Sequence, residues 1–248
     1  MKSASFVKLA LAMTCSVALT CSSLGLAASA NSDKNVRQGL PGRRISGGVR
    51  GECFNNASQS LIAMTPRNLL GKTAQARPTF WFSLPDTQSP KHISFEIFDA
   101  SDTAIYSTEM AQIDASGLSK VVLPETAPAL NQGENYRWVF SINCENTPDA
   151  SALEVQGWVR RVDISAAVSE QIASASLQER ADLYGEAELW HEQVTTLAER
   201  RLAEPASLEA QLAWAALIQS TGLDDYLADG PSETATGITS GVASTSIF

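Results

Sequence analysis

Histidine is the side chain that exchanges protons most readily near neutral pH, and this chain contains two of them. His92 begins an alternating apolar segment on its polar side, and His191 follows Trp190 in a segment with helical spacing. His191-Glu192 starts like the H-E-x-x-H motif of zinc proteases, but the second histidine is missing. Because neither histidine has a catalytic partner at a recognisable spacing, we name no catalytic residue and expect a protein that is not an enzyme.

Motifs for phosphate, nucleotide and metal binding are also missing or incomplete. The sequence contains no G-x-S-x-G, P-loop or dinucleotide fingerprint, and Gly47-Gly48-x-x-Gly51 lacks the flanking strand and helix of a phosphate cradle. Glu96, Asp99 and Asp102 cluster near one turn and offer oxygens of the kind that calcium binds. Turn formation by aspartate side chains explains this cluster better, because the ligand set is incomplete. We therefore predict no metal and no cofactor.

The first thirty residues have the order of an export signal. Lys2 and Lys8 provide a positive region, Leu9 to Leu19 an apolar region, and Ala28-Ser29-Ala30 a small-x-small site, so we expect cleavage after Ala30. The apolar run is too short and too rich in Ser and Thr for a spanning helix, and no later stretch is apolar enough to cross a bilayer. The pattern predicts a periplasmic or secreted protein without a transmembrane segment.

The chain is acidic, with a formal net charge of −9. Residues 1–30 hold two lysines and no acidic residue, so their removal lowers the charge to −11. A nucleic-acid-binding surface needs clustered Lys and Arg, and we therefore exclude nucleic acid as a partner. The sequence does not fix the oligomeric state.

Two cysteines remain after the signal, Cys53 and Cys144. In an oxidising compartment such a pair favours one structural disulfide, which stabilises by about 4–5 kcal/mol for a loop of this length in the chain-entropy model. A reactive thiol is the alternative, but neither cysteine is part of a C-x-x-C motif. A lipid anchor on Cys21, within the signal, is disfavoured because no small residue precedes it.

Residues 51–163 have the pattern of an antiparallel β domain. Short apolar runs alternate with turn residues, and in one run Ile93, Phe95 and Ile97 share a face. The predicted strands are Leu61–Thr65, Thr79–Leu84, His92–Phe98, Ala104–Met110, Leu118–Leu123, Tyr136–Asn143 and Leu153–Val162. Seven such strands predict a two-sheet sandwich. Leu130-x-x-Gly133-x-x-Tyr136 resembles the tyrosine corner of immunoglobulin-like sandwiches, in which the hydroxyl bonds to upstream backbone.

After Ser165 the spacing becomes helical, and we predict a small helical unit over residues 166–227. Ser176 to Glu179 fits a capping box. The predicted helices begin at this box, run over about Trp190–Ala203, and extend from Ser207 to about Thr221, the last with Leu208, Leu212, Ala215 and Leu217 at helical spacing. Tyr184, Trp190, Leu197 and Pro205 match offsets of a tetratricopeptide repeat, whereas Glu188, Gln193 and Arg200 replace its small residues. Because about one and a half repeats fit, we expect a unit that packs on the sandwich or on a partner.

The segments beside these two parts carry few structural signals. Residues 31–50 form a basic leader that we expect to be flexible, with contact to an anionic surface or partner as the alternative. Residues 228–248 are rich in Gly, Ser and Thr, and we expect them to be disordered. The predicted fold class is therefore α+β, mainly β: an immunoglobulin-like antiparallel sandwich followed by a tetratricopeptide-like helical unit.

Three tryptophans form the candidate interaction surface, Trp81, Trp158 and Trp190. Trp81 stands between two phenylalanines in a predicted strand, so it faces the opposite side of the sheet from them. Large residues on an outer sheet face can form a docking patch. The equal alternative is that the helical unit covers that face.

Several short motifs occur in an order that resembles a known family. They are Gly42-Arg43-Arg44, Gly47-Gly48-x-Arg50, Cys53, Leu61-Ile62-Ala63-Met64-x-Pro66, Arg77-Pro78-Thr79-Phe80-Trp81-Phe82, Tyr136-x-Trp138 to Cys144, Gly157-x-Val159-x-Arg161, Ala181-x-x-Tyr184 and Leu189-Trp190-x-Glu192. Over residues 40–227 the chain resembles the domain of unknown function numbered 928, an exported and mostly cyanobacterial family. The resemblance implies envelope sensor proteins as the setting for a partner, and it supplies no catalytic residue.

These patterns together predict an exported, non-enzymatic binding module that acts with a protein partner in the cell envelope. Two alternatives stay open: a hydrolase or redox enzyme with an unrecognised site that uses His92 or His191, and a protein that binds a small ligand or sugar.

Overall fold

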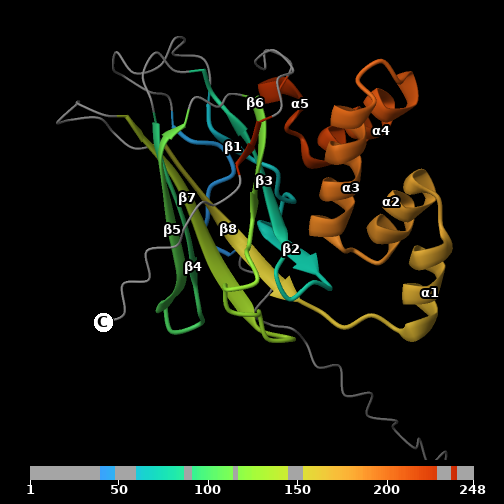
Figure 1. Ribbon diagram of the computed structural model, residues 1–248, viewed down its shortest axis with the longest axis horizontal. Coiled ribbons are helices and arrows are strands. Elements are labelled where there is room, and N and C mark those ends of the chain that lie inside the picture. The colour runs from blue at the N-terminus through green and yellow to red at the C-terminus, as the bar shows by residue number, and fades with distance from the viewer. Residues whose placement is uncertain are drawn as a thin grey trace, which may run out of the picture. The chain divides into compact units, whose positions relative to one another are not determined.

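Two β-sheets and a set of helices form three layers (Figure 1). The computed structural model describes residues 40–47, 60–86, 91–113, 117–144, 153–227 and 236–238. The strands are β1 (Ile62–Ala63), β2 (Leu70–Thr73), β3 (Thr79–Leu84), β4 (Lys91–Phe98), β5 (Ala104–Ile113), β6 (Gly117–Val122), β7 (Asn135–Cys144), β8 (Leu153–Arg161) and β9 (Thr236–Ile238). The helices are α1 (Ala166–Ser174), α2 (Leu177–Glu186), α3 (Trp190–Ala203), α4 (Leu208–Thr221) and α5 (Asp224–Leu227).

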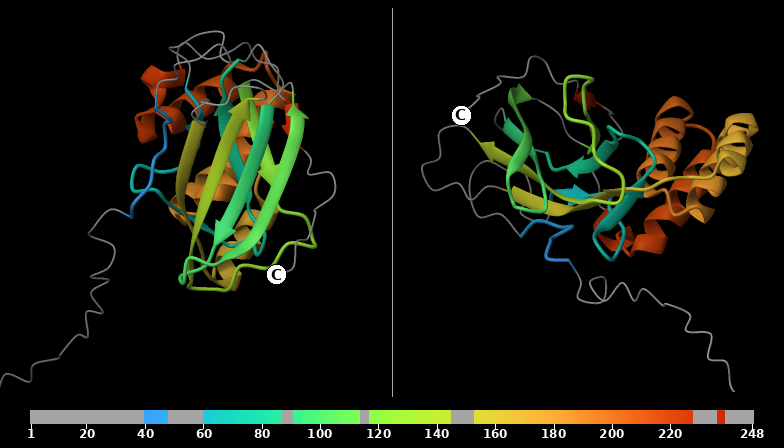
Figure 2. Two further views of the ribbon diagram at one scale, coloured as in Figure 1. Left: turned by 90° about the vertical axis from the view of Figure 1, so that its left-hand side faces the viewer. Right: turned by 90° about the horizontal axis from the view of Figure 1, so that it is seen from below.

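The strands divide between a four-stranded and a five-stranded sheet. The first has the order β1-β3-β6-β9, and the second has the order β2-β8-β7-β4-β5. The turned views in Figure 2 show the helices gathered on one side of the strands. Buried residues of β1 and β3 join those of α3 and α4 in one cluster, so the helices cover the outer side of β1 and β3 in the four-stranded sheet.

A mixed fold with a two-sheet sandwich confirms the coarse prediction, and all seven predicted strands are present. The prediction of purely antiparallel pairing is wrong at two places, because β2 runs parallel to β8 and β6 runs parallel to β9. Strand β2 was not predicted, since four residues with a central glycine give little strand signal. The chain crosses from one sheet to the other after β1, and β2 therefore pairs with a strand distant in sequence. Within the tail expected to be disordered, Thr236–Ile238 form β9.

Several predictions concern residues outside the described part of the chain. They are the export signal over 1–30, most of the leader over 31–50 and most of the tail over 228–248. Cys53 also lies outside it, and for Cys144, the last residue of β7, only the backbone is described. Among the described residues, no helix is long and apolar enough to cross a membrane.

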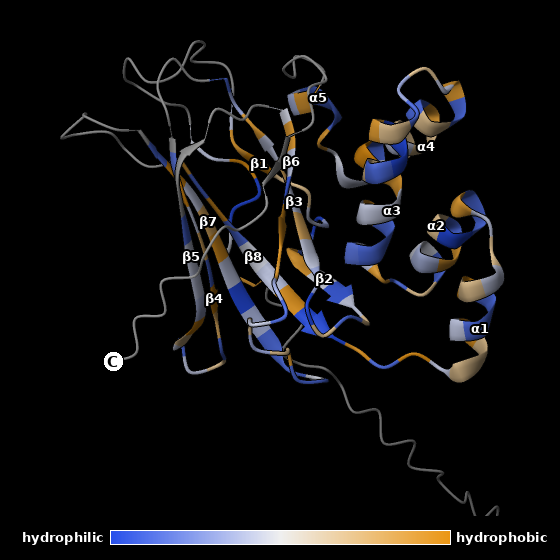
Figure 3. Cartoon of the chain, in the orientation of Figure 1, coloured by the Kyte–Doolittle hydropathy of each residue, from blue (hydrophilic) through white to orange (hydrophobic). Residues whose placement is uncertain are grey.

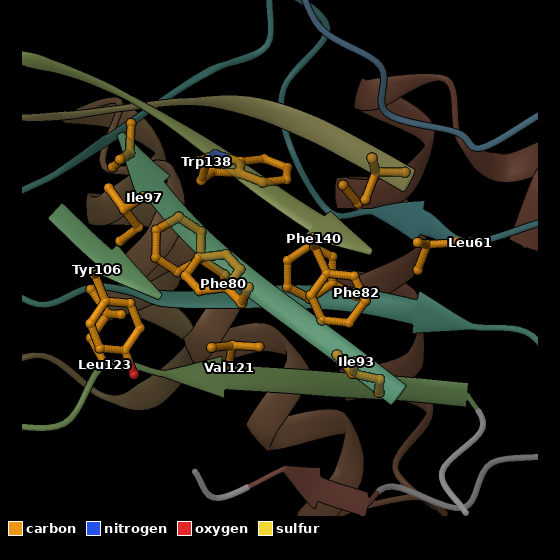
Figure 4. Packing of buried hydrophobic residues seen from close by; sticks show 14 of the residues in the cluster. Leu61, Phe80, Phe82, Ile93, Ile97, Tyr106, Val121, Leu123, Trp138 and Phe140 are labelled. Carbon is orange, nitrogen blue, oxygen red and sulfur yellow. The ribbon is translucent and has the colours of Figure 1, made fainter. Parts of the chain in front are cut away.

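Strand β3 is buried on both faces because it lies between the other sheet and the helices. Phe80 and Phe82 point into the sandwich, where Phe82 stacks on Phe140 with ring centroids 4.0 Å apart (Figure 4). Trp81 points to the opposite side and joins the cluster formed with the helices. Strands that are covered on both faces consist of continuous apolar runs, as the Phe-Trp-Phe sequence does.

A glycine and a tryptophan share one space in the sandwich core. Trp138 of β7 stands opposite Gly157 of β8 in the register of the two strands. A Cβ atom added at Gly157 would lie 2.5 Å from the Trp138 ring, so the indole occupies the volume that any side chain would need. The backbone of β8 can approach the ring only because residue 157 is glycine.

The predicted tyrosine-corner hydrogen bond is present. The backbone N–H of Asn131 donates to the Tyr136 hydroxyl over 3.1 Å, and the hydroxyl donates to Glu134 over 2.8 Å. Gly133 adopts a φ of 79°, a left-handed conformation that glycine accepts without strain. The tyrosine thus fixes the turn that leads into β7.

The helices confirm most of the predicted boundaries. Ser176 and Glu179 form the capping box reciprocally, and Gly222 ends α4 in a left-handed conformation. Helix α1 was not predicted as a separate element. In α4, Leu208 and Leu212 are exposed, whereas Trp214, Leu217 and Ile218 face the core.

We predict that Gly157→Ala destabilises the protein by about 1–3 kcal/mol, because the new methyl group overpacks against the fixed Trp138 ring. The measurement is the free energy of unfolding from urea titration. Gly185→Ala in α2 is the matched control, since its Cβ would meet only the mobile end of Gln193 and alanine favours the helix by up to about 1 kcal/mol. Equal losses in the two variants would contradict the account of Gly157.

Candidate functional site

The first turn of α3 provides the main polar contacts between the helices and the strands. Its N-terminal residues, Trp190, His191 and Glu192, each bond to a different part of the strand layers. The Trp190 indole N–H donates to the Met64 carbonyl oxygen over 2.9 Å. Lys72 of β2 also forms an ion pair with Glu188, just before the helix. This turn therefore determines where the helical layer meets the sheets.

Glu192 binds the connection between β2 and β3. Its Oε1 accepts hydrogen bonds from the Thr73 hydroxyl at 2.7 Å, the Ala74 N–H at 2.8 Å and the Gln75 N–H at 3.2 Å. The residue is only 8% exposed, and among the described residues Oε2 has no hydrogen-bond partner. A buried carboxylate needs such donors, so Oε1 is satisfied while Oε2 retains unused acceptor capacity.

His191 is enclosed between β2 and β3. Nδ1 lies 3.0 Å from the Thr79 carbonyl oxygen, which can only accept, so Nδ1 carries the proton and Nε2 has the lone pair. A Cβ at Gly71 would lie 2.6 Å from Nε2, and the ring packs edge-on against Phe80. Burial lowers the pKa of the His191 imidazole below its ordinary value, against the smaller opposite effects of the Thr79 hydrogen bond and the Glu192 carboxylate.

A hollow of about 280 Å³ opens between α3, α2 and the β2–β3 connection. Its lining offers polar and apolar surface in equal measure, and its polar side chains include Gln75, Arg77, Tyr184, Glu192, Thr195 and Thr196. Burial is the main cause that raises the pKa of the Tyr184 hydroxyl, and the nearby Glu192 carboxylate acts in the same direction. The hollow thus combines an acidic, a basic and several hydroxyl-bearing side chains.

The three predicted interaction tryptophans all donate their indole N–H groups within the chain. Trp81 is 3% exposed and donates to the Thr195 hydroxyl over 3.1 Å, so the helical unit covers this side of the sheet. Trp158 donates over 2.9 Å to the carbonyl oxygen of Pro41, which belongs to the segment at residues 40–47. Trp190 contacts Met64, as described above. Trp81 and Trp190 join the helices to the strands, and Trp158 joins β8 to the N-terminal segment.

The remaining residues considered for chemistry lie elsewhere. His92 is on β4, paired in register with Asn143, and it is not part of the hollow. Asp99 accepts three hydrogen bonds from Ser101 and Thr103 in the β4–β5 turn, and Asp102 pairs with Arg137. Among the described residues there is no group of three potential metal ligands. Turn formation therefore accounts for the aspartates.

His191-Glu192 was recognised in the sequence as an incomplete zinc-protease motif, but the residues that contact this pair were not identified there. Thr73, Gln75 and Arg77 come from a short connection without any motif, and they meet α3 only through the sheet topology. A glutamate in the first turn of a helix is ordinarily a solvent-exposed residue beside the helix dipole. Its burial depends on the fold and could not be recognised from spacing.

The model of the family described as Domain of Unknown Function (DUF928) matches residues 45–231. The chain belongs to this family. The match includes the hollow, the three tryptophans and the whole of α1 to α5. No curated protein matches the chain.

Among solved structures, two crystal structures of β-glucuronidase from Parabacteroides merdae are similar to part of this DUF928 protein. One has 12% sequence identity and a TM-score of 0.25, and the similarity covers 46% of this chain and 13% of the glucuronidase chain. The other has 13% identity and a TM-score of 0.24, with 48% and 13% covered. The similar part is thus a small fraction of each enzyme.

We predict that His191 makes the stability of the protein depend on pH. In the unfolded protein the His191 imidazole binds a proton near pH 6.5, whereas in the folded protein its pKa is lower. The free energy of unfolding therefore falls as the pH drops below about 6.5, and this group has no effect on it at higher pH. One such group contributes a slope of up to about 1.4 kcal/mol per pH unit. Urea unfolding between pH 7.5 and 5.5 should show a shallower slope for His191→Asn, which keeps a donor for Thr79 but does not titrate. Parallel slopes for the two proteins would contradict the prediction.

Proposed function

We propose that this protein is a non-enzymatic binding module whose partner-contacting surface is the outer face of α4. The observation that carries the proposal is that α4 places apolar residues on its uncovered side as well as on its covered side. Figure 3 shows how apolar and polar segments alternate along the helix. Leu208 is 67% exposed and Leu212 is 60% exposed, and Ala215 and Ala216 continue the exposed face. Glu209, Gln211 and Gln219 also lie on the exposed side, so the leucines and alanines form an apolar stripe bordered by polar residues, a form suited to a partner.

The charges beside this face indicate the chemistry of the partner. The exposed acidic residues near the two ends of α4 are Glu204 and Glu209, which both pair with Arg200, and Asp224 and Asp225 beyond the last turn. Leu208, Leu212 and Ala215 recur at the spacing of one helical stripe, which fits a facing helix. The proposed partner is therefore a protein that presents an amphipathic helix with an apolar stripe and flanking Lys or Arg residues.

The C-terminal end of α4 is bound by two arginines, Arg44 of the segment at residues 40–47 and Arg67 of the β1–β2 connection. Arg44 donates to the Thr221 carbonyl oxygen over 3.0 Å, and Arg67 donates to that of Ser220 over 3.1 Å. These carbonyl groups belong to the last turn, which carries the negative end of the helix dipole. A binding surface held in place before association loses less conformational entropy on binding.

The environment of His191 supports a non-enzymatic role. The imidazole lines the hollow but is only 8% exposed; its Nδ1 is engaged with Thr79, and its Nε2 faces the backbone of β2 at Gly71. A general acid or base must come within hydrogen-bond reach of a substrate. The contacts of His191 are instead those of a group that holds α3 against the sheets.

The cellular setting of the proposal comes from the sequence. We infer export after cleavage behind Ala30, a disulfide between Cys53 and Cys144, and a cyanobacterial envelope in which a sensor protein is the partner. The strand arrangement and the Tyr136 hydrogen bond support a relation to immunoglobulin-like sandwiches. The antiparallel helices α2 and α3 support the tetratricopeptide-like interpretation, in which the outer face of α4 stands where a further helix would pack.

We predict that Leu208→Glu and Leu212→Glu weaken partner binding by about 10–100-fold without loss of folding, since both side chains are exposed. A photo-crosslinking residue at position 208 or 212 in living cells should capture the same protein. That protein, once purified, should bind the unmodified chain in a titration and should bind the two glutamate variants more weakly.

Leu177 of α2 provides the matched control, because it is a leucine that is 50% exposed but lies outside α4. A crosslinker there should not capture the same protein, and Leu177→Glu should leave its binding unchanged. Capture of the same set of proteins from all three positions, or binding that is insensitive to Leu212→Glu, would refute the proposed surface.

A further inference from the structure

The hollow beside α3 contains several polar groups that a ligand could bind. Oε2 of Glu192 is buried and has no hydrogen-bond partner among the described residues, and the same holds for Nε2 of His191, which also lines the hollow. The Gln75 amide, the terminal nitrogens of Arg77 and the Tyr184 hydroxyl belong to side chains that are exposed or half-buried. These groups come from three separate elements and converge on one space of about 280 Å³. Convergent polar groups in a concave space are the usual form of a small-ligand site.

Glu192 and Arg77 have opposite charges but do not form an ion pair with each other in the described part of the chain. Glu192 is nine-tenths buried, and the three donors that reach it all bind Oε1. Arg77 is anchored through Nε, which donates to the Ala127 carbonyl oxygen over 2.8 Å. In the described part of the chain, neither side chain forms an ion pair. A buried carboxylate oxygen without a donor is costly, so an additional donor at Oε2 would be favourable.

We propose that this hollow binds a small zwitterion of the α-amino acid class. The ammonium group of the ligand provides the missing donor for Glu192 Oε2, and its carboxylate accepts from the terminal nitrogens of Arg77 in the paired geometry that guanidinium favours. Gln75 and Tyr184 remain available for the other polar atoms of the ligand. The volume corresponds to about nine water molecules, which suits a metabolite rather than a polymer.

The site is independent of the proposed docking face. It lies where α3 and α2 meet the β2–β3 connection, whereas the docking face is the outer side of α4. A bound ligand would bridge α3 and the β2–β3 connection, and it should therefore raise the midpoint of thermal unfolding. Either proposal can fail without the other.

The test is isothermal titration calorimetry of the full chain with the twenty common L-amino acids, each compared with its deaminated acid and its decarboxylated amine. For alanine these are propionate and ethylamine. The fluorescence of Trp81, whose indole N–H binds the lining residue Thr195, gives a second readout. We expect at least one amino acid to bind, and to bind at least about tenfold more tightly than either of its halves, a difference of about 1.4 kcal/mol.

Variants of Arg77 distinguish specific binding in the hollow from non-specific binding to the protein surface. Arg77→Gln should weaken binding of that amino acid at least about tenfold, and Arg77→Lys, which keeps the charge, should weaken it less. Arg137→Gln is the matched control, because this arginine pairs with Asp102 outside the hollow and its loss should leave binding unchanged. Tyr184→Phe keeps the ring and should weaken binding only modestly.

Three results would overturn the proposal. They are the absence of binding by any of the amino acids at millimolar concentration, equal binding of the amine or the acid alone, and equal binding by Arg77→Gln. Glu192→Gln should also weaken binding, but this variant is judged only if urea unfolding shows that it folds, because Oε1 holds the β2–β3 connection. The Arg77 variants decide the question whether or not it folds.

Discussion

Strands β1 and β3 of the four-stranded sheet are covered on both faces, and the positions of the other elements follow from this constraint. The residues of β3 alternate between two apolar environments: Phe80 and Phe82 enter the sandwich core, and Trp81 enters the cluster shared with α3 and α4. A sheet with two apolar faces would expose one of them to water if the helices were absent. The helical layer is thus a structural requirement of the sandwich, in addition to any role in binding.

This constraint explains why the first turn of α3 carries so many polar contacts. The apolar cluster holds the helices near the sheet without fixing their direction, whereas hydrogen bonds are directional. Trp190, His191 and Glu192 each bond to a different segment of the strand layers, and together they set the orientation of α3. The close approach depends on Gly71, where any side chain would collide with the imidazole. The hollow beside Glu192 and the uncovered side of α4 are consequences of that orientation.

Features that depend on nearby residues were predictable from the sequence, and features that depend on distant ones were not. The ends of α2 and α4 follow from the Ser176–Glu179 capping box and from Gly222, and the bond to Tyr136 follows from a seven-residue motif. Strand β2 was missed because its partner β8 lies far along the chain. For α4 the helix itself was predicted, but the helical spacing of Leu208, Leu212 and Leu217 did not show that Leu217 is buried and the other two are exposed. Residues apolar on both sides of a helix do not reveal which side is covered.

Native-state hydrogen exchange tests most directly the claim that the helices and the sandwich form one layered structure. The account predicts that the slowest amide protons of α3, near Val194–Ala198, and those of β3, near Phe80–Phe82, exchange with the same free energy of opening, because neither layer can keep its apolar surface buried alone. Replacing Trp81 with alanine should lower both values together. Exchange of the α3 amides through a much less costly opening, with the β3 amides still protected, would contradict the account.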